Sequence, residues 1–451
     1  MPAARGGVTV LAWKERTSGI IAPDERLPWG STLAMGVQHV LAMFGSTVVA
    51  PLIMGFDPNL AIFFSGIGTL LFFFIVGGKV PSYLGSSFAF IGPVGAVMAG
   101  GGTIPQALSG IIAAGFVYAS IGVVVHLAGS GWIDRLMPPV VTGAVVAIIG
   151  LNLAGAARSM AATDPLTAIV TIFAVLAIAL WTGGLIGRLP ILLGTAAGYI
   201  VTLLLRGTGS SGREIVGTIG PGIDLSKVAD AAWFGMPRFV TPELSWTAVG
   251  LIAPVAVVLI AENTGHIKAV SEMTDRNLMP YLGRGFIGDG LATMIAGAGG
   301  GTGVTTYAEN IGVMAVTRVY STLIFIIAAA VAILLGFSPK FGALIQSIPQ
   351  GVLGGVATVL FGLIAATGAR IWVANRVDFT NGSNLFIVAV TLIIGAADYT
   401  LTLGDFALNG IALGTFGAIL LHQLFGRIVR LDDYEFIADD AIAAAEERVR
   451  D

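Results

Sequence analysis

Long runs of hydrophobic residues, separated by short polar stretches, dominate the chain. A membrane-spanning helix needs about 20 such residues, and with that length as a ruler the runs predict fourteen spans. The predicted spans are 32–53, 59–77, 88–100, 107–128, 139–157, 166–185, 189–205, 247–266, 283–298, 308–316, 319–337, 350–367, 384–399 and 406–425. The pattern therefore predicts an all-α membrane protein.

Two of these segments, 88–100 and 308–316, are too short to cross a membrane as whole helices. The second follows residues 299–307, which are too rich in glycine and β-branched residues to form a regular helix. We expect a short extended break in span 3 and another in span 10.

The two breaks resemble each other. The sequence SSFA at 86–89 matches TTYA at 305–308, an offset of 219 residues. Further pairs lie upstream, at 66–68 and 288–290, and downstream, at 138–143 and 349–354. A repeat of seven spans is odd, so the second copy must be inverted. Two inverted seven-span repeats with paired broken helices are typical of secondary transporters, which bind substrate between the breaks.

Composition supports this class and excludes others. Of 451 residues, 55% are hydrophobic and 11% charged, against roughly 25% charged in ordinary soluble domains. The net charge of −3 and the lack of a basic run give no indication of a nucleic-acid partner. With no cysteine and four scattered histidines, we expect no metal and no cofactor. Motifs of phosphate loops and nucleophile elbows are missing, so we expect no enzyme.

The basic residues predict the orientation. Most fall in gaps on the amino-terminal side, so that side is expected to be cytoplasmic, with both termini there and no signal peptide removed. The predicted divisions outside the spans are a cytoplasmic segment 1–30, an extracellular loop 207–245 and a cytoplasmic acidic tail 427–451.

Ionisable groups inside the membrane mark a candidate site, because a charge at membrane depth is costly. Glu309 follows the second break, and Glu262 and His266 share one face of a helix at positions i and i+4. The breaks expose backbone N–H donors, and the half-helices that follow point their positive ends the same way. A small planar ligand with both C=O and N–H groups, an oxo-pyrimidine or oxo-purine, would match.

The run Glu309-Asn310-x-Gly312-x4-Thr317-Arg318 resembles the signature of the nucleobase–ascorbate transporter family, also called nucleobase–cation symporter family 2. The similarity begins at Gln38-His39 and covers nearly the whole chain. The carboxylate that opens the signature is similar to that of bacterial uracil and pyrimidine permeases.

The resemblance implies a proton-coupled symporter that imports a nucleobase, most simply uracil, across the cytoplasmic membrane. A core domain (31–128 and 246–338) would move against a gate domain (129–206 and 339–426), through which two copies could form a homodimer. It implies that Glu262 and Glu309 accept the N–H groups of the base and that the backbone N–H groups of Phe88 and Ala308 meet its carbonyl oxygens.

The remaining site residues have competing interpretations. The resemblance implies that His266 adjusts protonation of the site; it could instead cap carbonyls near a helix end or hold Glu262. His39 is a candidate for proton coupling or a packed polar residue, and Tyr307 for base stacking or packing. Asp289 could be a second proton site, but we favour a helix-end role.

Two departures from uracil permeases concern selectivity. Ala308 replaces a glycine, and Phe361 and Ala357 stand where a tyrosine and a serine are found. A xanthine, purine or broader pyrimidine permease therefore remains an alternative. A channel would need a ring of pore charges, and an anion exchanger of the same architecture would want a site without carboxylates.

Overall fold

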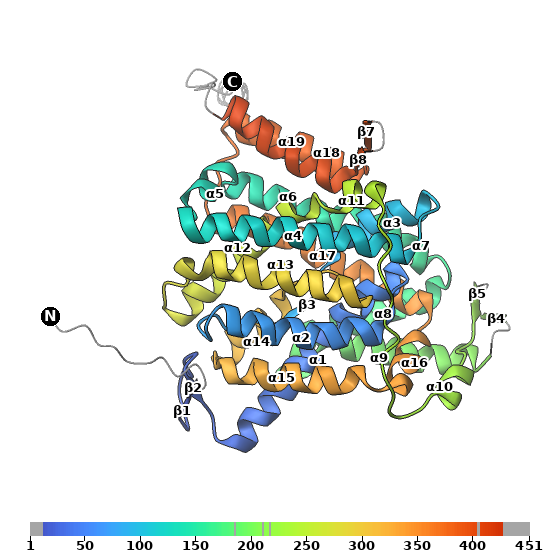
Figure 1. Ribbon diagram of the computed structural model, residues 1–451. Coiled ribbons are helices and arrows are strands. Elements are labelled where there is room, and N and C mark those ends of the chain that lie inside the picture. Colours follow the sequence, from blue (N-terminus) through green and yellow to red (C-terminus); the bar gives the residue numbers. More distant parts are fainter. Residues whose placement is uncertain (1–11, 185, 210–211, 216–217, 404–405, 427–451) are drawn as a thin grey trace, which may run out of the picture.

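The protein is described by a computed structural model that covers residues 12–184, 186–209, 212–215, 218–403 and 406–426. The predicted acidic tail 427–451 and the first eleven residues of the predicted amino-terminal segment lie outside the described residues. Within the described part, helices fill most of the chain (Figure 1).

The helices of the first half run from Trp29 to Arg206. They are α1 Trp29–Met54, α2 Pro58–Ile75, η1 Phe88–Phe90, α3 Ile91–Ala99, α4 Ile104–Ala128, α5 Gly131–Leu136, α6 Pro139–Asn152, α7 Ala154–Ala161, α8 Pro165–Trp181, η2 Ile186–Arg188 and α9 Pro190–Arg206.

The helices of the second half follow a connecting stretch. They are α10 Ser226–Asp230, α11 Trp246–Ile252, α12 Val255–Thr274, η3 Met279–Tyr281, α13 Leu282–Gly299, α14 Ala308–Thr317, α15 Thr322–Gly336, α16 Pro339–Gln346, α17 Gln350–Ala374, α18 Gly382–Ala396 and α19 Gly410–Phe425.

Among the described residues, eight short strands form four separate pairs. The pairs are β1 Lys14–Glu15 with β2 Glu25–Arg26, β3 Leu84–Ser86 with β6 Val304–Thr306, β4 Gly212–Ile215 with β5 Thr218–Pro221, and β7 Leu401–Leu403 with β8 Phe406–Leu408. The two breaks predicted in spans 3 and 10 are therefore strands that pair with each other.

Length and hydropathy identify a multi-pass arrangement. In the described ranges, six helices are long and apolar enough to cross a membrane, or seven if α15 and α16, bent by 84°, count as one span. The six are Trp29–Met54, Pro58–Ile75, Ile104–Ala128, Pro139–Ala161, Trp246–Thr274 and Gln350–Ala374. Five shorter apolar helices accompany them. The count of fourteen spans stays a prediction.

Most predicted spans match a helix closely, but two differences matter. Helix α12 continues to Thr274, eight residues past its predicted end at 266. The prediction stopped early because the last two turns contain polar and charged residues, which a ruler based on hydropathy excludes. The short helix α16 was not predicted, since it is amphipathic rather than apolar.

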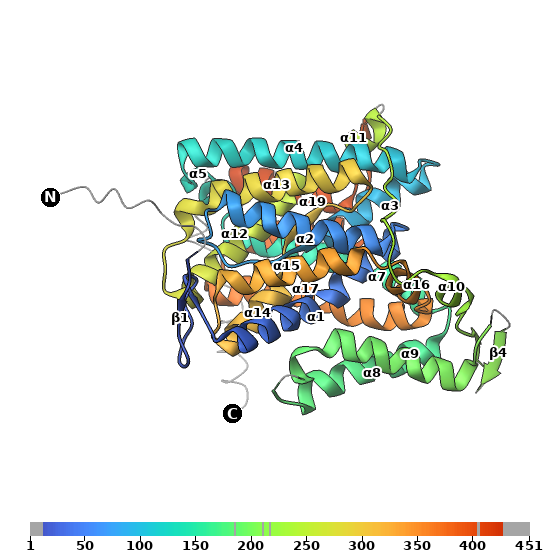
Figure 2. The same cartoon turned by 60° about the horizontal axis from the view of Figure 1, so that its bottom comes forward.

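Several of the main helix contacts in one half recur between the counterpart helices. Helix α4 packs on α13 as α2 packs on α15, and α2 and α13 pack on each other. Likewise α8 contacts α9 as α18 contacts α19, and α8 contacts α17 as α18 contacts α6. Figure 1 shows α4, α13, α2 and α15 in succession, and Figure 2 shows α8 and α9 at one edge of the molecule.

Two glycines permit the closest of these contacts. A Cβ on Gly290 of α13 would lie 2.6 Å from the Gly115 carbonyl oxygen of α4, and a Cβ on Gly66 of α2 would lie 2.5 Å from the Ala329 carbonyl oxygen of α15. Small residues at these places let the helix backbones approach. The two crossings use one glycine from each copy of the repeat noted in the sequence, Gly66 and Gly290, although that repeat aligned Gly66 with Gly288.

Residues 13–26 fasten the far end of α14. The Ile21 N–H donates to the Arg318 carbonyl at 3.0 Å, and the Tyr320 N–H donates to the Ile21 carbonyl at 2.8 Å. Asp24 pairs with Arg276, between α12 and η3, at 2.5 Å. This segment holds the end of α14 that lies away from the breaks.

Candidate functional site

The two broken spans meet at β3 and β6. These strands are antiparallel, with Leu84 opposite Thr306, Gly85 opposite Thr305 and Ser86 opposite Val304. The ladder continues at both ends: the Ser87 N–H donates to the Gly303 carbonyl at 2.9 Å, and the Tyr307 N–H donates to the Tyr83 carbonyl at 3.0 Å.

This ladder defines the symmetry of the site. The bond from Ser87 to Gly303 and the bond from Tyr307 to Tyr83 exchange when residue numbers shift by 220. The offset of 219 inferred from similar side chains is therefore one residue too small for the backbone. The ladder makes Phe88 equivalent to Ala308 and Ala89 equivalent to Glu309, so Glu309 has no acidic counterpart in the first break.

Buried threonines satisfy the edges of both strands. The Thr69 hydroxyl of α2 accepts from the Leu84 N–H at 2.9 Å, and the Thr293 hydroxyl of α13 accepts from the Val304 N–H at 3.2 Å. An unpaired N–H at this depth would cost several kcal/mol. These contacts hold both breaks extended.

A half-helix begins immediately after each strand. Ser87 precedes η1 and α3, and Tyr307 precedes α14. The first N–H groups of a helix have no partner within it, so the Phe88 and Ala308 N–H groups are available donors at positive helix ends. The structure thus supplies the backbone geometry expected from the sequence.

The two half-helices differ in exposure. Ala308 and Gly312 on α14 are exposed, and no atom would meet a Cβ on Gly312 within 4 Å. On α3, a Cβ on Gly92 would lie 3.1 Å from side-chain atoms of both Asn152 and Asn409. At the counterpart positions Gly312 and Gly92, α14 is therefore exposed and α3 is packed against side chains.

The Phe88 side chain is buried and packs against α17. It is 9% exposed and meets Phe361 of α17 edge to face, with ring centroids 5.8 Å apart. The departure at Phe361 noted in the sequence therefore places an apolar ring against a site residue.

Glu309 and Glu262 both reach the region between the half-helices. Glu309 lies in the first turn of α14, is half-buried, and accepts a hydrogen bond from the Ser46 hydroxyl of α1. Glu262 is half-buried on α12, a helix that contacts α14, β6 and η1. The site thus presents carboxyl acceptors beside backbone donors.

His266 joins this site through β6. Its Nδ1 lies 2.8 Å from the Thr306 hydroxyl. The residue is inside α12, not at its end, because α12 continues to Thr274. A role in capping that helix is therefore wrong, and a role in the chemistry of the site stays a prediction.

A buried amide that sequence reasoning missed links four elements. Asn263 Nδ2 of α12 donates to Asp289 of α13 and to the Tyr118 hydroxyl of α4, while its Oδ1 accepts from the Thr305 hydroxyl at 3.1 Å and from the Thr306 hydroxyl. All four hydrogen-bonding positions of the amide are used. Asn263 thereby fixes β6 relative to the helix that carries Glu262.

Asp289 is not a helix-end residue, contrary to our expectation. It lies within α13, is 1% exposed and bonds to Asn263, while its Oδ1 has no partner among the described residues. A charged group in this position is costly unless it is paired. Whether Asp289 carries a proton stays untested.

Tyr307 and His39 contact the frame around α14. The Tyr307 hydroxyl donates to the Ser86 carbonyl at 2.8 Å, and its ring is 3% exposed. His39 is fully buried, and its Nδ1 lies 3.0 Å from Asn310 Nδ2. Both side chains are therefore hydrogen-bonded to neighbouring elements of the protein.

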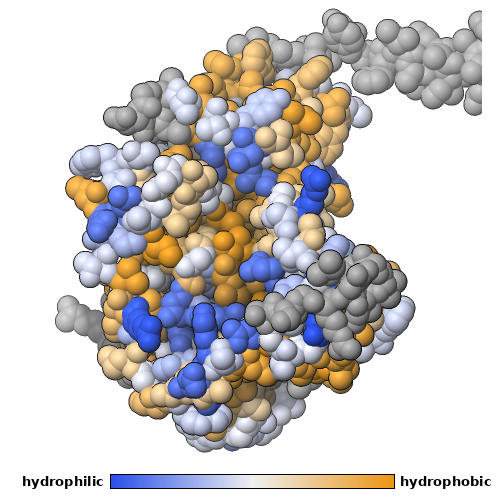
Figure 3. Space-filling model, turned by 90° about the vertical axis from the view of Figure 1, so that its right-hand side faces the viewer, coloured by the Kyte–Doolittle hydropathy of each residue, from blue (hydrophilic) through white to orange (hydrophobic). Residues whose placement is uncertain are grey.

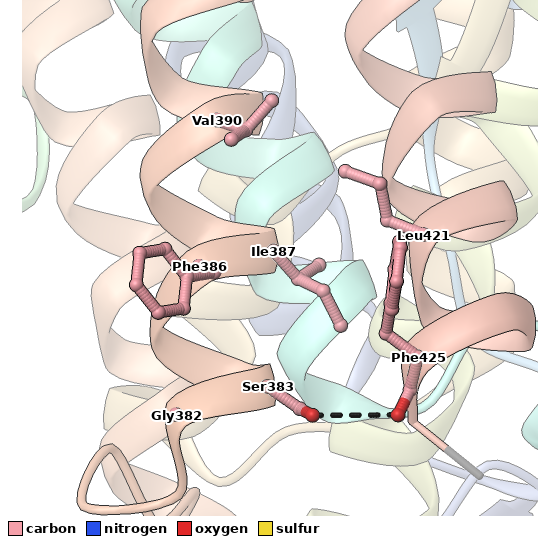
Figure 4. Close-up of a pocket in the computed structure, with 7 residues that line it drawn as sticks. All are labelled: Gly382, Ser383, Phe386, Ile387, Val390, Leu421 and Phe425. Atoms are coloured by element: carbon pink, nitrogen blue, oxygen red, sulfur yellow. Dashed lines mark hydrogen bonds between the residues drawn. The ribbon is translucent and has the colours of Figure 1, made fainter. Parts of the chain in front are cut away.

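The other features of the described residues show no comparable grouping of donors and carboxyl groups. In the described ranges, no group of three or more potential metal ligands occurs. A cavity of about 270 Å³ between α18 and α19 is lined by apolar side chains, with one bond from the Ser383 hydroxyl to the Phe425 carbonyl at 3.4 Å (Figure 4). Figure 3 shows a hollowed face, on the side of α3 and α7 in Figure 1, where hydrophobic and polar residues alternate.

Comparison with known proteins places the chain in a family. The permease family model matches residues 30–404. The chain is 58% identical over 418 residues to RutG of Escherichia coli (strain K12), which carries the name of a pyrimidine permease, covering 91% of this chain and 93% of that protein. It is 41% identical to a uracil permease of Bacillus caldolyticus (89% and 93% covered) and 39% identical to one of Escherichia coli (strain K12) (94% and 98% covered).

Solved structures share the fold at low identity. The murine anion transporter Slc26a9 in its inward-facing state matches with a TM-score of 0.66 at 11% identity, covering 88% of this chain and 68% of that one. The transmembrane domain of the cyanobacterial bicarbonate transporter BicA matches with a TM-score of 0.56 at 14% identity, covering 87% and 96%. The chain belongs to the permease family of nucleobase–ascorbate transporters, and is a multi-pass membrane transporter rather than an enzyme.

Proposed function

We propose that this permease is a proton-coupled symporter that imports a nucleobase, uracil in the first place, across the cytoplasmic membrane. The observation that carries the proposal is that backbone N–H donors and carboxyl acceptors occur in the same region of the structure. Backbone N–H groups begin η1 and α14, Glu309 lies in the first turn of α14, and Glu262 lies on α12, which contacts both η1 and α14. The uracil and pyrimidine permease relatives agree with this choice.

The ligand chemistry follows from that arrangement. Uracil carries two carbonyl oxygens and two N–H groups. The Phe88 and Ala308 N–H groups would meet its oxygens, and Glu262 and Glu309 would accept its N–H groups. Burial disfavours the charged form of a carboxyl group, so Glu262 and Glu309 are suited to take up a proton. His266 contacts the neighbouring strand β6 through the Thr306 hydroxyl.

The proposed movement divides the helices into two domains. The core is 31–128 with 246–338, and the gate is 129–206 with 339–426. The recurring contacts of α2 with α15 and α4 with α13, and of α8 with α9 and α18 with α19, support two inverted seven-span repeats. The six long helices, the bent pair, the five shorter apolar helices, α13 and α14 make up the fourteen spans.

Three finer proposals accompany this division. Both termini are cytoplasmic, so α14 runs from its break toward the cytoplasm and α3 runs from its break toward the outside. Residues 207–245 form an extracellular loop. A homodimer forms through the gate domain, whose α8 exposes Phe173 and Trp181 to 68% and 85%.

Transport assays test the substrate. Purified full-length protein in proteoliposomes should take up radiolabelled uracil saturably, and unlabelled uracil should compete. Cytosine should compete poorly, because it has an amino donor where uracil has a carbonyl and would face another donor. Competition by xanthine would widen the substrate range, equal competition by cytosine would contradict the donor–acceptor arrangement, and uptake of bicarbonate but not bases would favour an anion exchanger.

A further inference from the structure

Ser46 reaches across from α1 to Glu309. The side chain is 1% exposed, and its hydroxyl donates to Glu309 Oε1. Two buried hydroxyls on other helices bond to their own helix: Thr264 of α12 donates to the Ile260 carbonyl at 2.6 Å and Thr415 of α19 to the Ile411 carbonyl at 2.7 Å. In the part of the chain described, the Ser46 hydroxyl is committed to Glu309 instead.

Helix α1 contacts three residues around the start of α14, namely Tyr307, Glu309 and Asn310. Besides the contact of Ser46 with Glu309, the Thr47 hydroxyl lies 3.2 Å from the Tyr307 hydroxyl. Asn310 donates to the His39 carbonyl at 3.0 Å. His39 and Ser46 are seven residues apart and therefore share a helix face. The Glu309 carboxyl group is thus oriented by the same surface that fixes its helix.

A hydroxyl has a property that matters beside a group that gains and loses a proton. It donates to a carboxylate, and it accepts from the O–H of a carboxylic acid. The contact between Ser46 and Glu309 can therefore survive protonation by reversing its direction. An alanine would leave Glu309 without this partner in both states.

We propose that Ser46 is a positioning residue that keeps the Glu309 carboxyl group in one orientation in both its charged and its protonated state, and so sets the affinity of the site for the base. The inference rests on the proposed function, because it assigns Glu309 to the base. Ser46 itself is too deeply buried to contact the ligand.

Ionisable groups on the helices packed against α14 could also change protonation state over the pH range of a binding experiment. Helices α1 and α12 pack against α14, and they contribute His39, Glu262 and His266. Tyr307, which immediately precedes α14, is a further ionisable group beside Glu309. None of these groups bonds to the Ser46 hydroxyl, so replacing Ser46 removes a contact of Glu309 alone.

The test is uracil binding by the full-length protein in detergent, measured across the range from about pH 5 to pH 9, which brackets ordinary histidine and displaced carboxyl titrations. Ser46→Ala should weaken binding about five- to tenfold, as expected for one lost hydrogen bond of about 1–1.4 kcal/mol, and by the same factor at every pH. Ser46→Thr, which restores a hydroxyl, should recover most of it. Ser120→Ala, an exposed serine that bonds to its own helix at Phe116, is the matched control.

A double variant shows whether the effect passes through Glu309. In a Glu309→Gln background, Ser46→Ala should add less than about twofold, because coupled residues are not additive. Melting curves report folding; should Ser46→Ala fail to fold, Ser46→Cys, with a weak thiol in the same volume, gives the same comparison.

The outcomes separate the inference from the function. Wild-type affinity in Ser46→Ala at every pH would overturn the inference, and so would a loss confined to the alkaline end, since the hydroxyl would then serve the charged state only. A wild-type protein that shows no saturable uracil binding would instead overturn the proposed function.

Discussion

Asn263 and Asp289 form a buried hydrogen bond between α12 and α13, in which the amide of Asn263 donates to the carboxyl group of Asp289. Through its oxygen the same amide holds Thr306 of β6. One side chain therefore sets the distance between a break strand and the helix that carries Glu262.

We expect Asn263→Ala to destabilise the protein and weaken uracil binding together. The variant removes the hydrogen-bond partner of Asp289 and of the Thr305 hydroxyl, at a cost of about 1–3 kcal/mol for each unsatisfied buried group. Melting of the detergent-solubilised protein and equilibrium uracil binding check this. Asn375→Ala, which removes an exposed amide bonded to its own helix at Ile371, is the control. Unchanged melting and affinity in Asn263→Ala would contradict the assignment.

We expect Glu309→Gln to weaken uracil binding at least about tenfold. The change replaces an acceptor oxygen by an NH₂ donor that faces an N–H group of the base, and such a mismatch costs about 1–3 kcal/mol. Binding titrations measure the effect. Glu272→Gln, on the exposed polar end of α12, should bind as wild type. Wild-type affinity in Glu309→Gln would remove Glu309 from the ligand site.

Acid should destabilise the protein through a buried ion pair far from the site. Asp164, at the start of α8, pairs with Arg206 at 2.9 Å, and their side chains are 2% and 0% exposed. Burial alone would raise the pKa of Asp164, but hydrogen bonds from Arg206 and Thr167 outweigh burial, and its pKa is lowered from 3.8.

The sign follows from that lowered pKa. The stabilisation is complete above the unfolded-state pKa of about 3.9, and it is lost as the pH falls below that value through the folded-state pKa. Asp164→Asn should cost about 3–5 kcal/mol at neutral pH and flatten the loss of stability in acid. Melting temperatures across pH, with the exposed Asp230→Asn as control, measure this; identical curves for wild type and Asp164→Asn would refute it.

The spans and the breaks could be predicted because they depend on local composition. A run of apolar residues marks a helix in the membrane wherever it packs, and glycine and β-branched residues at 299–307 prevent a regular helix before Ala308. The pairing of the two breaks was predicted only as a shared location. Their register depends on backbone hydrogen bonds between Leu84 and Thr306, and side-chain similarity pointed one residue away from it.

The residues that hold the site could not be predicted in the same way. Ser46 is one of several hydroxyls in α1, and its bond to Glu309 joins residues 263 positions apart. Asn263 and Asp289 lie on different helices, so spacing along the chain does not connect them. His266 was placed near a helix end because the polar turns up to Thr274 do not resemble a span.

Proton-driven accumulation of uracil in proteoliposomes, under an imposed pH gradient and with the membrane potential clamped, tests the central claim most directly. If one proton moves with each base, the wild-type protein should concentrate uracil about tenfold for each pH unit of the gradient. One pH unit supplies about 1.4 kcal/mol per proton, and this free energy corresponds to a factor of ten. Glu262→Gln should exchange uracil without concentrating it, while His266→Ala should shift the pH optimum. Wild-type uptake that never exceeds the external concentration, or Glu262→Gln that accumulates uracil as wild type does, would contradict coupling at this site.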